Sequence, residues 1–351
     1  FNFYFSPGST TDVFGVVRMV QPNSNASTTN LIRGQIFNKI DGIQLTKTNL
    51  GTLLSSETYT LNLATYTTNG TDTTDDDNLM DSSETITLSK TVFSENPIFK
   101  TEILTSNNEN VGYLMYNGFV ADYDAQLNAA FAEFQSQNIQ HLILDLRYNP
   151  GGSVNSAAAL GSMITGISNG IFAKLQYNSD LQSNNTNYDF KSSLSEGIGI
   201  NSVGLNKVYV IATKGSASAS EMIINSLRSY INVVHIGTKT VGKSQASVTL
   251  YDSPNFQRQG ANPSHLYALQ PLVAITVNKD DLKVPSTGLI PTIEVEENVS
   301  NYGVLGDINE PLLAAALASI QTGRFGILPK GISPILDSNS FKPHAKEMYI
   351  D

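Results

Sequence analysis

Residues 208–224 read VYVIATKGSASASEMII, an apolar run followed by a small-residue turn and a periodic apolar segment. The run Val208–Ala212 predicts a buried strand, and the segment that continues through Met222 and Tyr230 predicts a helix. Strands that alternate with helices form βαβ units around a mostly parallel sheet. This stretch therefore predicts an α/β fold.

The same alternation extends over residues 93–324, which we expect to form one core. Apolar runs predict strands, and spaced apolar residues predict an amphipathic helix over 122–137 and a second helix containing Ala157 and Ile164. The further expected strands are residues 111–116, 142–146 and 233–237.

The N-terminal part has a different pattern. Residues 1–9 are aromatic, are broken by Pro-Gly and are expected to be a lead-in segment. Residues 10–92 predict a small β-rich domain, because residues 59–64 and 85–89 alternate with period two. The polar, acidic residues 67–84 between these two runs predict an exposed loop. Residues 325–351 have little pattern and are expected to form a C-terminal tail.

Composition restricts the partners and the chemistry. The 351 residues carry a formal net charge of -10, which argues against nucleic acid because phosphate binding needs clustered Lys and Arg. The chain has no cysteine, so disulfides, thiolate metal sites and a cysteine nucleophile are excluded. No stretch approaches the roughly 20 apolar residues that span a bilayer. Because the chain starts at Phe1, we expect an upstream segment, and a membrane anchor only there.

A serine and a lysine 25 residues apart carry the chemical signal. Ser218 lies in Ser-Ala-Ser-Ala-Ser-Glu, and Lys243 lies in Thr-Val-Gly-Lys-Ser. A serine hydroxyl becomes a good nucleophile when a base removes its proton. A lysine is such a base when burial keeps its amine neutral. The pair predicts a hydrolase that needs neither histidine, metal nor any other cofactor.

Each signal also has an ordinary structural interpretation. Ser218 and Glu221 fit a helix capping box, and a lysine next to glycine is most often a surface charge. The position of Ser218 at a strand-to-helix junction favours catalysis, because backbone N–H groups at the helix start stabilise an oxyanion. Capping and catalysis are compatible, since Glu221 can fix the turn that presents Ser218.

The segment Asp145-Leu146-Arg147-Tyr148-Asn149-Pro150-Gly151-Gly152 is the third signal. It fits a strand that ends in a Pro-Gly turn. Its glycines also let backbone N–H groups approach a reacting carbonyl oxygen closely.

Together, and in this order, these segments resemble the tail-specific, or C-terminal-processing, serine proteases. The resemblance extends weakly to the G-x-x-P element Gly288–Pro291. It implies a crotonase/Clp-protease-like spiral of ββα units, with Ser218 as nucleophile and Lys243 as general base. It also implies oxyanion N–H groups from Gly151 or Gly152 and from Ala219, with Ser216 and Ser220 in support.

The order of elements in residues 10–92 resembles a PDZ domain. The resemblance rests on Phe14-Gly15-Val16-Val17 and on Arg33-Gly34-Gln35-Ile36 leading to Ile40-Asp41-Gly42. It implies that Phe14, Gly15, Val16 and Val17 receive an extended peptide by strand addition. An ordinary small β domain is the alternative. The family's substrates are polypeptides, often unstructured C-terminal tails. The resemblance and the composition together imply a periplasmic, cell-envelope or secreted protein.

One position departs from the family pattern. Many members have Gln four residues after the lysine, and here that position is Ser247. Thr240, Gln245 or Ser247 is expected to orient the amine instead. The departure keeps a second hypothesis open, a catalytically inactive peptide-binding protein on a protease fold.

Other catalytic classes are disfavoured. The four histidines, His141, His235, His265 and His344, lie in no Ser-His-Asp motif, and His235 falls in a core-like strand. No H-E-x-x-H or clustered carboxylate–histidine pattern predicts a metal site.

Overall fold

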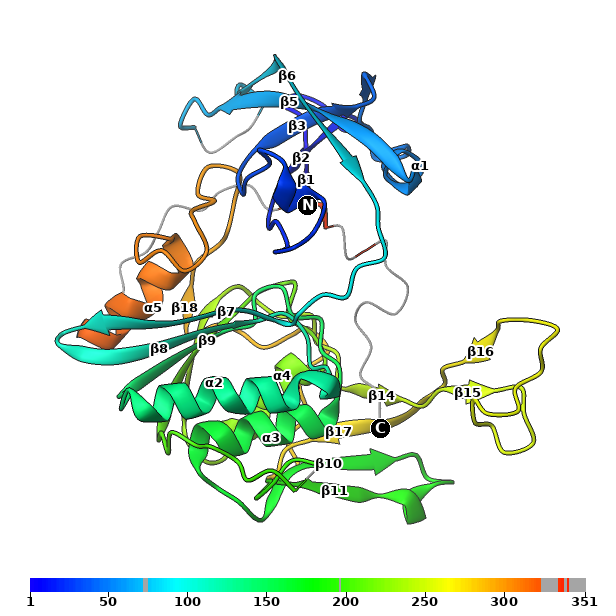
Figure 1. Ribbon diagram of the computed structural model, residues 1–351, viewed down its shortest axis with the longest axis vertical. Helices are drawn as coiled ribbons and strands as arrows, with labels where there is room; N and C mark the ends of the chain where they lie inside the picture. The colour runs from blue at the N-terminus through cyan, green and yellow to red at the C-terminus, as the bar shows by residue number, and fades with distance from the viewer. Residues whose placement is uncertain (72–74, 196, 323–333, 338–339, 341–351) are drawn as a thin grey trace. The chain divides into compact units, whose positions relative to one another are not determined.

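The computed structural model describes residues 1–71, 75–195, 197–322, 334–337 and 340. They divide into two compact units (Figure 1). Unit 1 comprises residues 1–95 and 295–314 together with a short strand near residue 336, and unit 2 comprises residues 96–294 and 315–322. The chain passes from unit 1 to unit 2 between residues 95 and 96, and residues 295–314, expected in the core, belong to unit 1.

Unit 1 is built on one antiparallel sheet of seven strands in the order β19-β1-β2-β3-β5-β6, with β4 paired to β3. Its elements are β1 (Asn2–Phe5), β2 (Val13–Val16), β3 (Ile36–Ile40), β4 (Ile43–Gln44), α1 (Leu50–Ser55), β5 (Thr58–Thr67), β6 (Asn78–Ser89) and β19 (Leu336–Asp337), with a 3-10 turn at Ala26–Thr28.

The N-terminal segment differs from the prediction. Residues 2–5 are not a lead-in but form β1, which pairs with β2 over four residue pairs from Asn2↔Val16 to Phe5↔Val13. The aromatic residues that suggested a linker fill the unit's interior. Phe3 and Tyr4 are fully buried, and Phe3 packs in the same cluster as Phe37.

The predicted acidic loop 67–84 is also shorter than expected. β5 and β6 pair from Thr58↔Ser89 to Thr67↔Asn78, so only residues 68–77 connect them. Most side chains of β6 are exposed. Residues 78–84 are therefore polar because they lie in an exposed strand. Composition alone does not distinguish such a strand from a loop. Asp72 lies outside the described residues.

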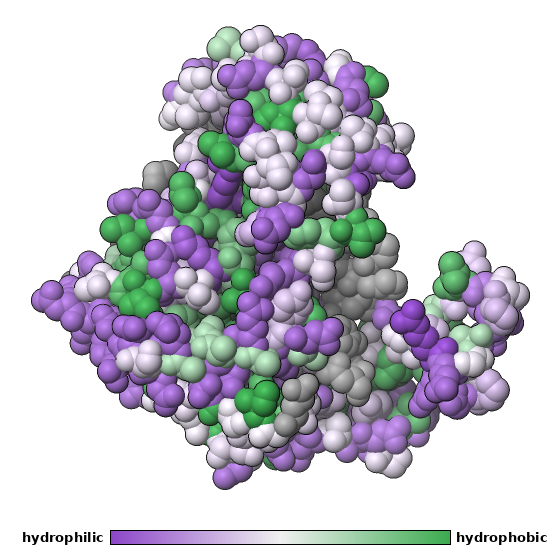
Figure 2. Space-filling view, in the orientation of Figure 1, coloured by the Kyte–Doolittle hydropathy of each residue, from purple (hydrophilic) through white to green (hydrophobic). Residues whose placement is uncertain are grey.

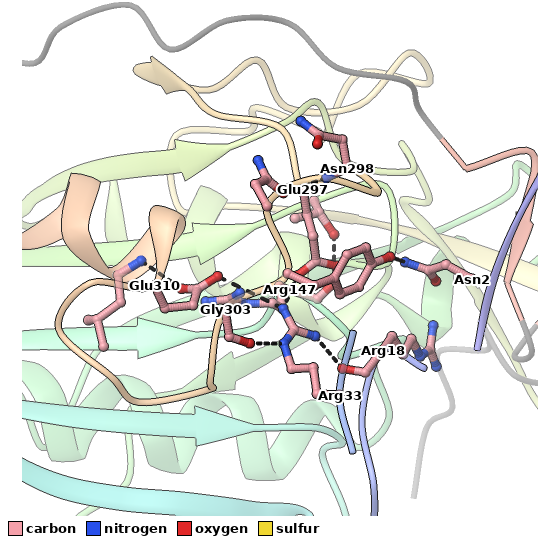
Figure 3. Close-up of polar contacts among 12 residues, drawn as sticks. Asn2, Arg18, Arg33, Arg147, Glu297, Asn298, Gly303 and Glu310 are labelled. Carbon is pink, nitrogen blue, oxygen red and sulfur yellow. Dashed lines mark hydrogen bonds and ion pairs between the residues drawn. The ribbon is translucent and has the colours of Figure 1, made fainter. Parts of the chain in front are cut away.

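Residues 295–314 join unit 1 through Arg33. The Nε of Arg33 donates to Gly303 O at 2.7 Å, and its guanidinium also contacts the buried Glu297 (Figure 3). Tyr302 packs with Tyr4 and Phe14, and the two tyrosine hydroxyls are 2.9 Å apart. These contacts span more than 250 residues of sequence, so no local pattern predicts them.

Unit 2 confirms the mixed α/β fold class, with several sheets and helices packed against them. Its central sheet has the order β18-β13-β12-β9-β8-β7, in which all pairs are parallel except β7 with β8. The strands are β7 (Ile98–Ser106), β8 (Glu109–Tyr116), β9 (His141–Asp145), β12 (Lys207–Ala212), β13 (Asn232–Gly237) and β18 (Ile293–Glu294).

Helices cover this sheet and close the core. α2 (Asp124–Ser136) and α3 (Val154–Thr165) lie side by side (Figure 1), and α4 (Ala219–Leu227) packs against α3. The caps of α3 are clear: the Ser153 side chain accepts the N–H of Ser156, and Gly166 ends the helix in the left-handed region. α5 (Pro311–Thr322) follows at the end of the described core.

A second sheet has the order β11-β10-β17-β14, and a separate pair β15–β16 forms an arm. Figure 2 shows apolar and polar residues intermingled on this arm, where Phe256, Leu266 and Tyr267 are exposed. The elements are β10 (Ile171–Tyr177), β11 (Thr186–Asp189), β14 (Gln245–Ser247), β15 (Leu250–Tyr251), β16 (Ala268–Leu269) and β17 (Leu272–Val277), with 3-10 turns at Ala121–Tyr123 and Gln182–Asn184.

Candidate active site

The predicted catalytic segments follow three adjacent parallel strands. β9 leads to residues 146–153, β12 to 213–218 and β13 to 238–243. Because carboxyl ends of parallel strands meet at one edge of a sheet, the three loops converge there. Backbone hydrogen bonds join them: Ala217 N donates to Asn149 O at 3.2 Å, and Val241 N donates to Ser216 O at 3.1 Å.

Ser218 lies at the start of α4 in an unusual backbone conformation, with φ 61° and ψ −116°. A non-glycine residue in such a region costs on the order of 1–3 kcal/mol and persists only where its surroundings impose it. The residue is fully buried, and its Oγ has no hydrogen-bond partner among the described residues. A buried hydroxyl without a partner is costly in structural terms and is typical of a functional group.

Glu221 holds the serine segment and the lysine segment together. Its Oε2 accepts the backbone N–H of Ser218 at 3.0 Å and that of Lys243 at 2.8 Å. Its Oε1 accepts the hydroxyl of Thr240 and the N–H of Gly242 at 2.6 Å. The carboxylate is fully buried, so these four donors supply the hydrogen bonds that water would otherwise provide.

Lys243 is half-buried, and the tight backbone before it depends on glycine. Gly242 has φ +90°, and a Cβ there would lie 2.3 Å from Ser286 O. The G-x-x-P element packs at the same place, because a Cβ on Gly288 would lie 2.0 Å from Thr240 O. This element therefore shapes the loop that carries Lys243. The close packing is a physical reason for glycine in the G-x-x-P element.

The two glycines of the third segment have different environments. Gly151 has φ +113°, and a Cβ there would lie 2.7 Å from Ser218 Cβ. Its N–H already donates to Asn149 Oδ1 at 2.9 Å. The N–H groups of Gly152 and Ala219 make no hydrogen bond among the described residues. Of the three predicted oxyanion donors, Gly152 and Ala219 thus have N–H groups available for a ligand.

The predicted supporting residues divide into two groups. Thr240 Oγ1 donates to Glu221 and accepts Leu289 N–H at 2.7 Å, so its role is to orient Glu221. Gln245 and Ser247 lie in β14, the first half-buried and the second buried. Ser216 Oγ donates to Leu146 O at 2.7 Å, and Ser220 Oγ donates to Asn149 O at 2.9 Å. Both serines therefore tie the nucleophile segment to the glycine segment.

Asn149 is a site residue to which the sequence reasoning assigned no role. Its Nδ2 donates to Tyr116 O at 2.8 Å, its Oδ1 accepts Gly151 N–H, and its backbone oxygen accepts Ser220 Oγ. An asparagine before Pro-Gly is expected in any turn, so only its buried position distinguishes it.

A buried ion pair anchors the start of the glycine segment. The Arg147 guanidinium contacts Asp145 with Nη2–Oδ2 at 2.7 Å, and Tyr113 donates its hydroxyl to Asp145 Oδ2 at 2.8 Å. Both charged side chains are fully buried. The pair thereby fixes the end of β9 from which the glycine segment departs.

The predicted peptide-binding strand has no open edge. β2 pairs with β1 on one side and with β3 on the other. Phe14, Val16 and Val17 are fully buried, and Val17 exchanges backbone hydrogen bonds with Gly34 and Gln35. The prediction of strand addition at Phe14–Val17 is therefore wrong, because residues 2–5 already occupy the edge that a peptide would need.

The histidines are engaged elsewhere. His235 is fully buried in β13, where burial lowers its pKa to about 4 and its Nε2 lies 3.1 Å from Ala212 O. His141 pairs with Glu109, and His265 pairs with Asp252. His344 lies outside the described residues. Ser218 Oγ makes no hydrogen bond within the described chain, so neither the Lys243 amine nor any of the other three histidines is hydrogen-bonded to it there.

Among the residues that the structure describes, no group of three or more His, Asp or Glu side chains is arranged to hold a metal ion. No helix in the same part of the chain is both long and apolar enough to cross a membrane.

Comparison with known proteins adds independent information. The model of the family "Peptidase family S41" matches residues 110–261, which include all three catalytic segments. A probable CtpA-like serine protease of Staphylococcus epidermidis is 27% identical over 179 residues, 48% of this chain and 34% of the relative. A carboxyl-terminal-processing protease of Picosynechococcus is 23% identical over 241 residues, 68% of this chain and 51% of the relative. The chain thus spans between about a third and a half of these curated relatives.

A solved structure covers more of the chain. The crystal structure of a putative S41 protease from Bacteroides fragilis superposes with a TM-score of 0.75 at 31% sequence identity. The match covers 92% of this chain and 81% of that protein, so it includes both units. With the serine, lysine and glycine segments at one sheet edge, and with this similarity along nearly the whole chain, the protein belongs to peptidase family S41.

Proposed function

We propose that the protein is a serine endopeptidase of the tail-specific type, in which Ser218 is the nucleophile and Lys243 the general base. The observation that carries the proposal is the shared acceptor: one oxygen of Glu221 binds the backbone N–H groups of both Ser218 and Lys243. A single rigid carboxylate thereby sets the spacing of the two segments, as nucleophile and base require.

The proposed reaction proceeds by acyl transfer. Neutral Lys243 takes the proton of Ser218 Oγ as the oxygen attacks the peptide carbonyl carbon. The N–H groups of Gly152 and Ala219 donate to the developing oxyanion. As the carbon–nitrogen bond breaks, the protonated lysine returns its proton to the departing amine. Water then attacks the acyl-enzyme with Lys243 again as base, which releases the acid and restores Ser218.

The substrates that we propose are polypeptides, including unstructured C-terminal tails, in line with the name of the Picosynechococcus relative, a carboxyl-terminal-processing protease. The N-terminal β unit, which we propose to be PDZ-like, would engage the chain to be cleaved. We also propose a location outside the cytoplasm, in the periplasm, the cell envelope or the medium.

The test is cleavage of an unfolded protein by the wild-type chain, Ser218→Ala and Lys243→Ala, with folding checked by thermal melting. The proposal expects cleavage by wild type alone while all three proteins stay folded. Retained cleavage by folded Ser218→Ala would disprove the assignment.

A second candidate is a peptide-binding protein on an inactive protease fold. It is favoured by Ser247, which is buried in β14 four residues after the lysine, where the family resemblance leads us to expect Gln. This candidate expects no cleavage by any of the three proteins, and peptide binding that Ser218→Ala leaves unchanged.

A further inference from the structure

The side chain of Asn149 joins the glycine segment to the neighbouring strand β8. Its Nδ2 donates to Tyr116 O, at the end of β8, at 2.8 Å, and its Oδ1 accepts the N–H of Gly151 at 2.9 Å. Asn149 is fully buried, so water does not compete for either hydrogen bond. A carboxamide suits this position because its nitrogen donates while its oxygen accepts. The side chain thus ties Gly151 to the end of β8.

The main chain of Asn149 contacts the serine segment. Its backbone oxygen accepts the hydroxyl of Ser220 at 2.9 Å and the N–H of Ala217 at 3.2 Å. These two residues lie on either side of Ser218 in the sequence. Asn149 therefore links the serine segment, through its main chain, to Gly151, through its side chain.

Phe119 determines the direction in which the N–H of Gly152 points. The N–H of Phe119 donates to Gly151 O at 2.9 Å, and Ser153 N–H donates to Phe119 O at 2.9 Å, which is a parallel bridge between Phe119 and Gly152. Gly151 O and the N–H of Gly152 belong to one planar trans peptide unit, in which they point in opposite directions. Because the oxygen faces Phe119, the N–H of Gly152 faces away from it.

Gly151 is the joint between two peptide units that are held by different partners. It has φ +113° and no side chain, so its own chemistry restrains its backbone rotation little. Asn149 holds the peptide unit that precedes Gly151, and Phe119 holds the unit that follows it. The direction of the Gly152 N–H therefore depends on both contacts.

We propose that Asn149 is a positioning residue that keeps the N–H of Gly152 aimed at the developing oxyanion. It acts through Gly151, because loss of the Asn149 bond frees rotation at this glycine and misdirects the next N–H group. An oxyanion donor contributes to catalysis only in the correct direction and at the correct distance. The inference rests on the proposed function, in which the Gly152 N–H is an oxyanion donor.

Asn149→Ser removes the bridge without adding a charge. The shorter hydroxyl side chain cannot bind Tyr116 O and the N–H of Gly151 together. We expect a fluorophosphonate to label Ser218 of this variant about 100-fold more slowly than in wild type. The rate is measured well below the melting temperature of each protein, so that only folded chains are compared.

Asn149→Asp tests whether the bridge can be restored. A protonated carboxyl group donates to Tyr116 O and accepts the N–H of Gly151, as the carboxamide does, and burial favours this neutral form. An ionised carboxylate only accepts. Labelling should therefore approach the wild-type rate near about pH 5 and fall towards the rate of Asn149→Ser as the carboxyl ionises. Rates are expressed relative to wild type at each pH, which cancels the titration of groups common to both, Lys243 included.

The matched control is Asn128→Ser, on α2. Asn128 is also buried, its Nδ2 donates to Gly199 O at 2.9 Å, and its Oδ1 accepts the N–H of Asn201 at 2.8 Å. This variant loses the same two kinds of hydrogen bond as Asn149→Ser. It should lower the melting temperature but label Ser218 at the wild-type rate at every pH.

Three results would overturn the inference. They are labelling of folded Asn149→Ser at the wild-type rate, an Asn149→Asp rate in acid no higher than that of Asn149→Ser, and equal slowing by Asn128→Ser. Failure of the proposed function looks different. In that case a folded wild-type chain would neither cleave an unfolded protein nor react with the fluorophosphonate, and the role of Asn149 would fall with it.

Discussion

Ser218 and Lys243 donate their backbone N–H groups to the same oxygen of Glu221, at 3.0 and 2.8 Å. The two residues, which we propose as nucleophile and base, are 25 residues apart in sequence and come from loops after different strands. Their relative position is thus set by one buried carboxylate and not by the loops alone. We regard Glu221 as a positioning residue, because its contacts in this structure are to the backbone of the two segments.

Glu221→Gln should uncouple the two segments. The amide has one oxygen where the carboxylate has two, so its NH₂ group would face two of the N–H or O–H donors. We expect the free energy of unfolding to fall by about 2–4 kcal/mol and turnover to fall about 100-fold. The informative measurement is the rate at which a fluorophosphonate labels Ser218. The rate is measured well below the melting temperature, where a loss of stability alone leaves the labelling rate unchanged.

The matched control is Glu310→Gln. Glu310 is also a buried carboxylate at the start of a helix, and its Oε2 accepts Leu313 N–H at 2.9 Å. This variant should lose stability but label Ser218 at the wild-type rate. If both variants label equally fast, Glu221 has a structural role only.

Gly151→Ala should displace Ser218, the nucleophile that we propose. The new Cβ would lie 2.7 Å from Ser218 Cβ and 3.0 Å from its Oγ, closer than such atoms approach. We expect kcat/KM to fall about 100-fold, because a displacement of the nucleophile of about 1 Å has effects of that size.

Gly170→Ala is the matched control, because it introduces backbone strain without a clash of this kind. Gly170 also has positive φ, +85°, but nothing lies within 4 Å of its Cβ position. This variant should cost about 1 kcal/mol of stability and keep its activity. Comparable activity of the two alanine variants would show that the space beside Ser218 is not needed.

The stability of the protein should decrease in acid through His235. Burial lowers the pKa of His235 to about 4, against 6.5 for the free side chain. Between these values the unfolded chain binds a proton that the folded chain does not, so stability falls as the pH falls from 6.5 to 4. Above pH 6.5 both states are neutral and this residue adds no pH dependence.

The expected size of this effect is at most about 3 kcal/mol. Urea unfolding of wild type and His235→Gln at several pH values measures it, and the glutamine variant should have the shallower slope in that window. Parallel slopes for the two proteins would contradict the assignment.

The ion pair of Asp145 and Arg147 should behave as a coupled unit. Either Asp145→Leu or Arg147→Met leaves a buried charge without its partner, which costs about 3–5 kcal/mol. The double variant should lose clearly less stability than the sum of the two single variants. Thermal or denaturant unfolding of the four proteins measures the coupling, and additive losses would indicate independent roles.

The local pattern was sufficient for four strands of the central sheet of unit 2 and for the helices beside them. The strands predicted at residues 111–116, 142–146, 208–212 and 233–237 correspond to β8, β9, β12 and β13, with β9 ending one residue early at Asp145, and α2 lies within the predicted range 122–137. Their apolar periodicity is strong because both faces of the central sheet, or one face of the helix, are buried. Sequence order and strand direction then bring the three catalytic segments to one edge.

The sequence pattern gave wrong predictions where long-range packing determines the secondary structure. Residues 2–5 look like a linker, yet they form a strand because β2 and the aromatic interior of unit 1 accept them. The consequence is functional, since this strand closes the edge at Phe14–Val17 that the sequence had suggested for peptides. Likewise, residues 78–84 look like a loop because an exposed strand face has the same polar composition.

Residue chemistry and spacing along the chain therefore predicted the candidate site: the side chains of Ser218 and Lys243, and backbone N–H groups at Gly151 or Gly152. The tertiary structure decided which backbone N–H groups are available to a ligand. The side chain of Asn149 accepts the N–H of Gly151, whereas the N–H groups of Gly152 and Ala219 make no hydrogen bond among the described residues. It also decided what positions the pair, because four donors from distant loops converge on Glu221. Hydrogen bonds between segments depend on their arrangement in space, which local sequence patterns do not encode.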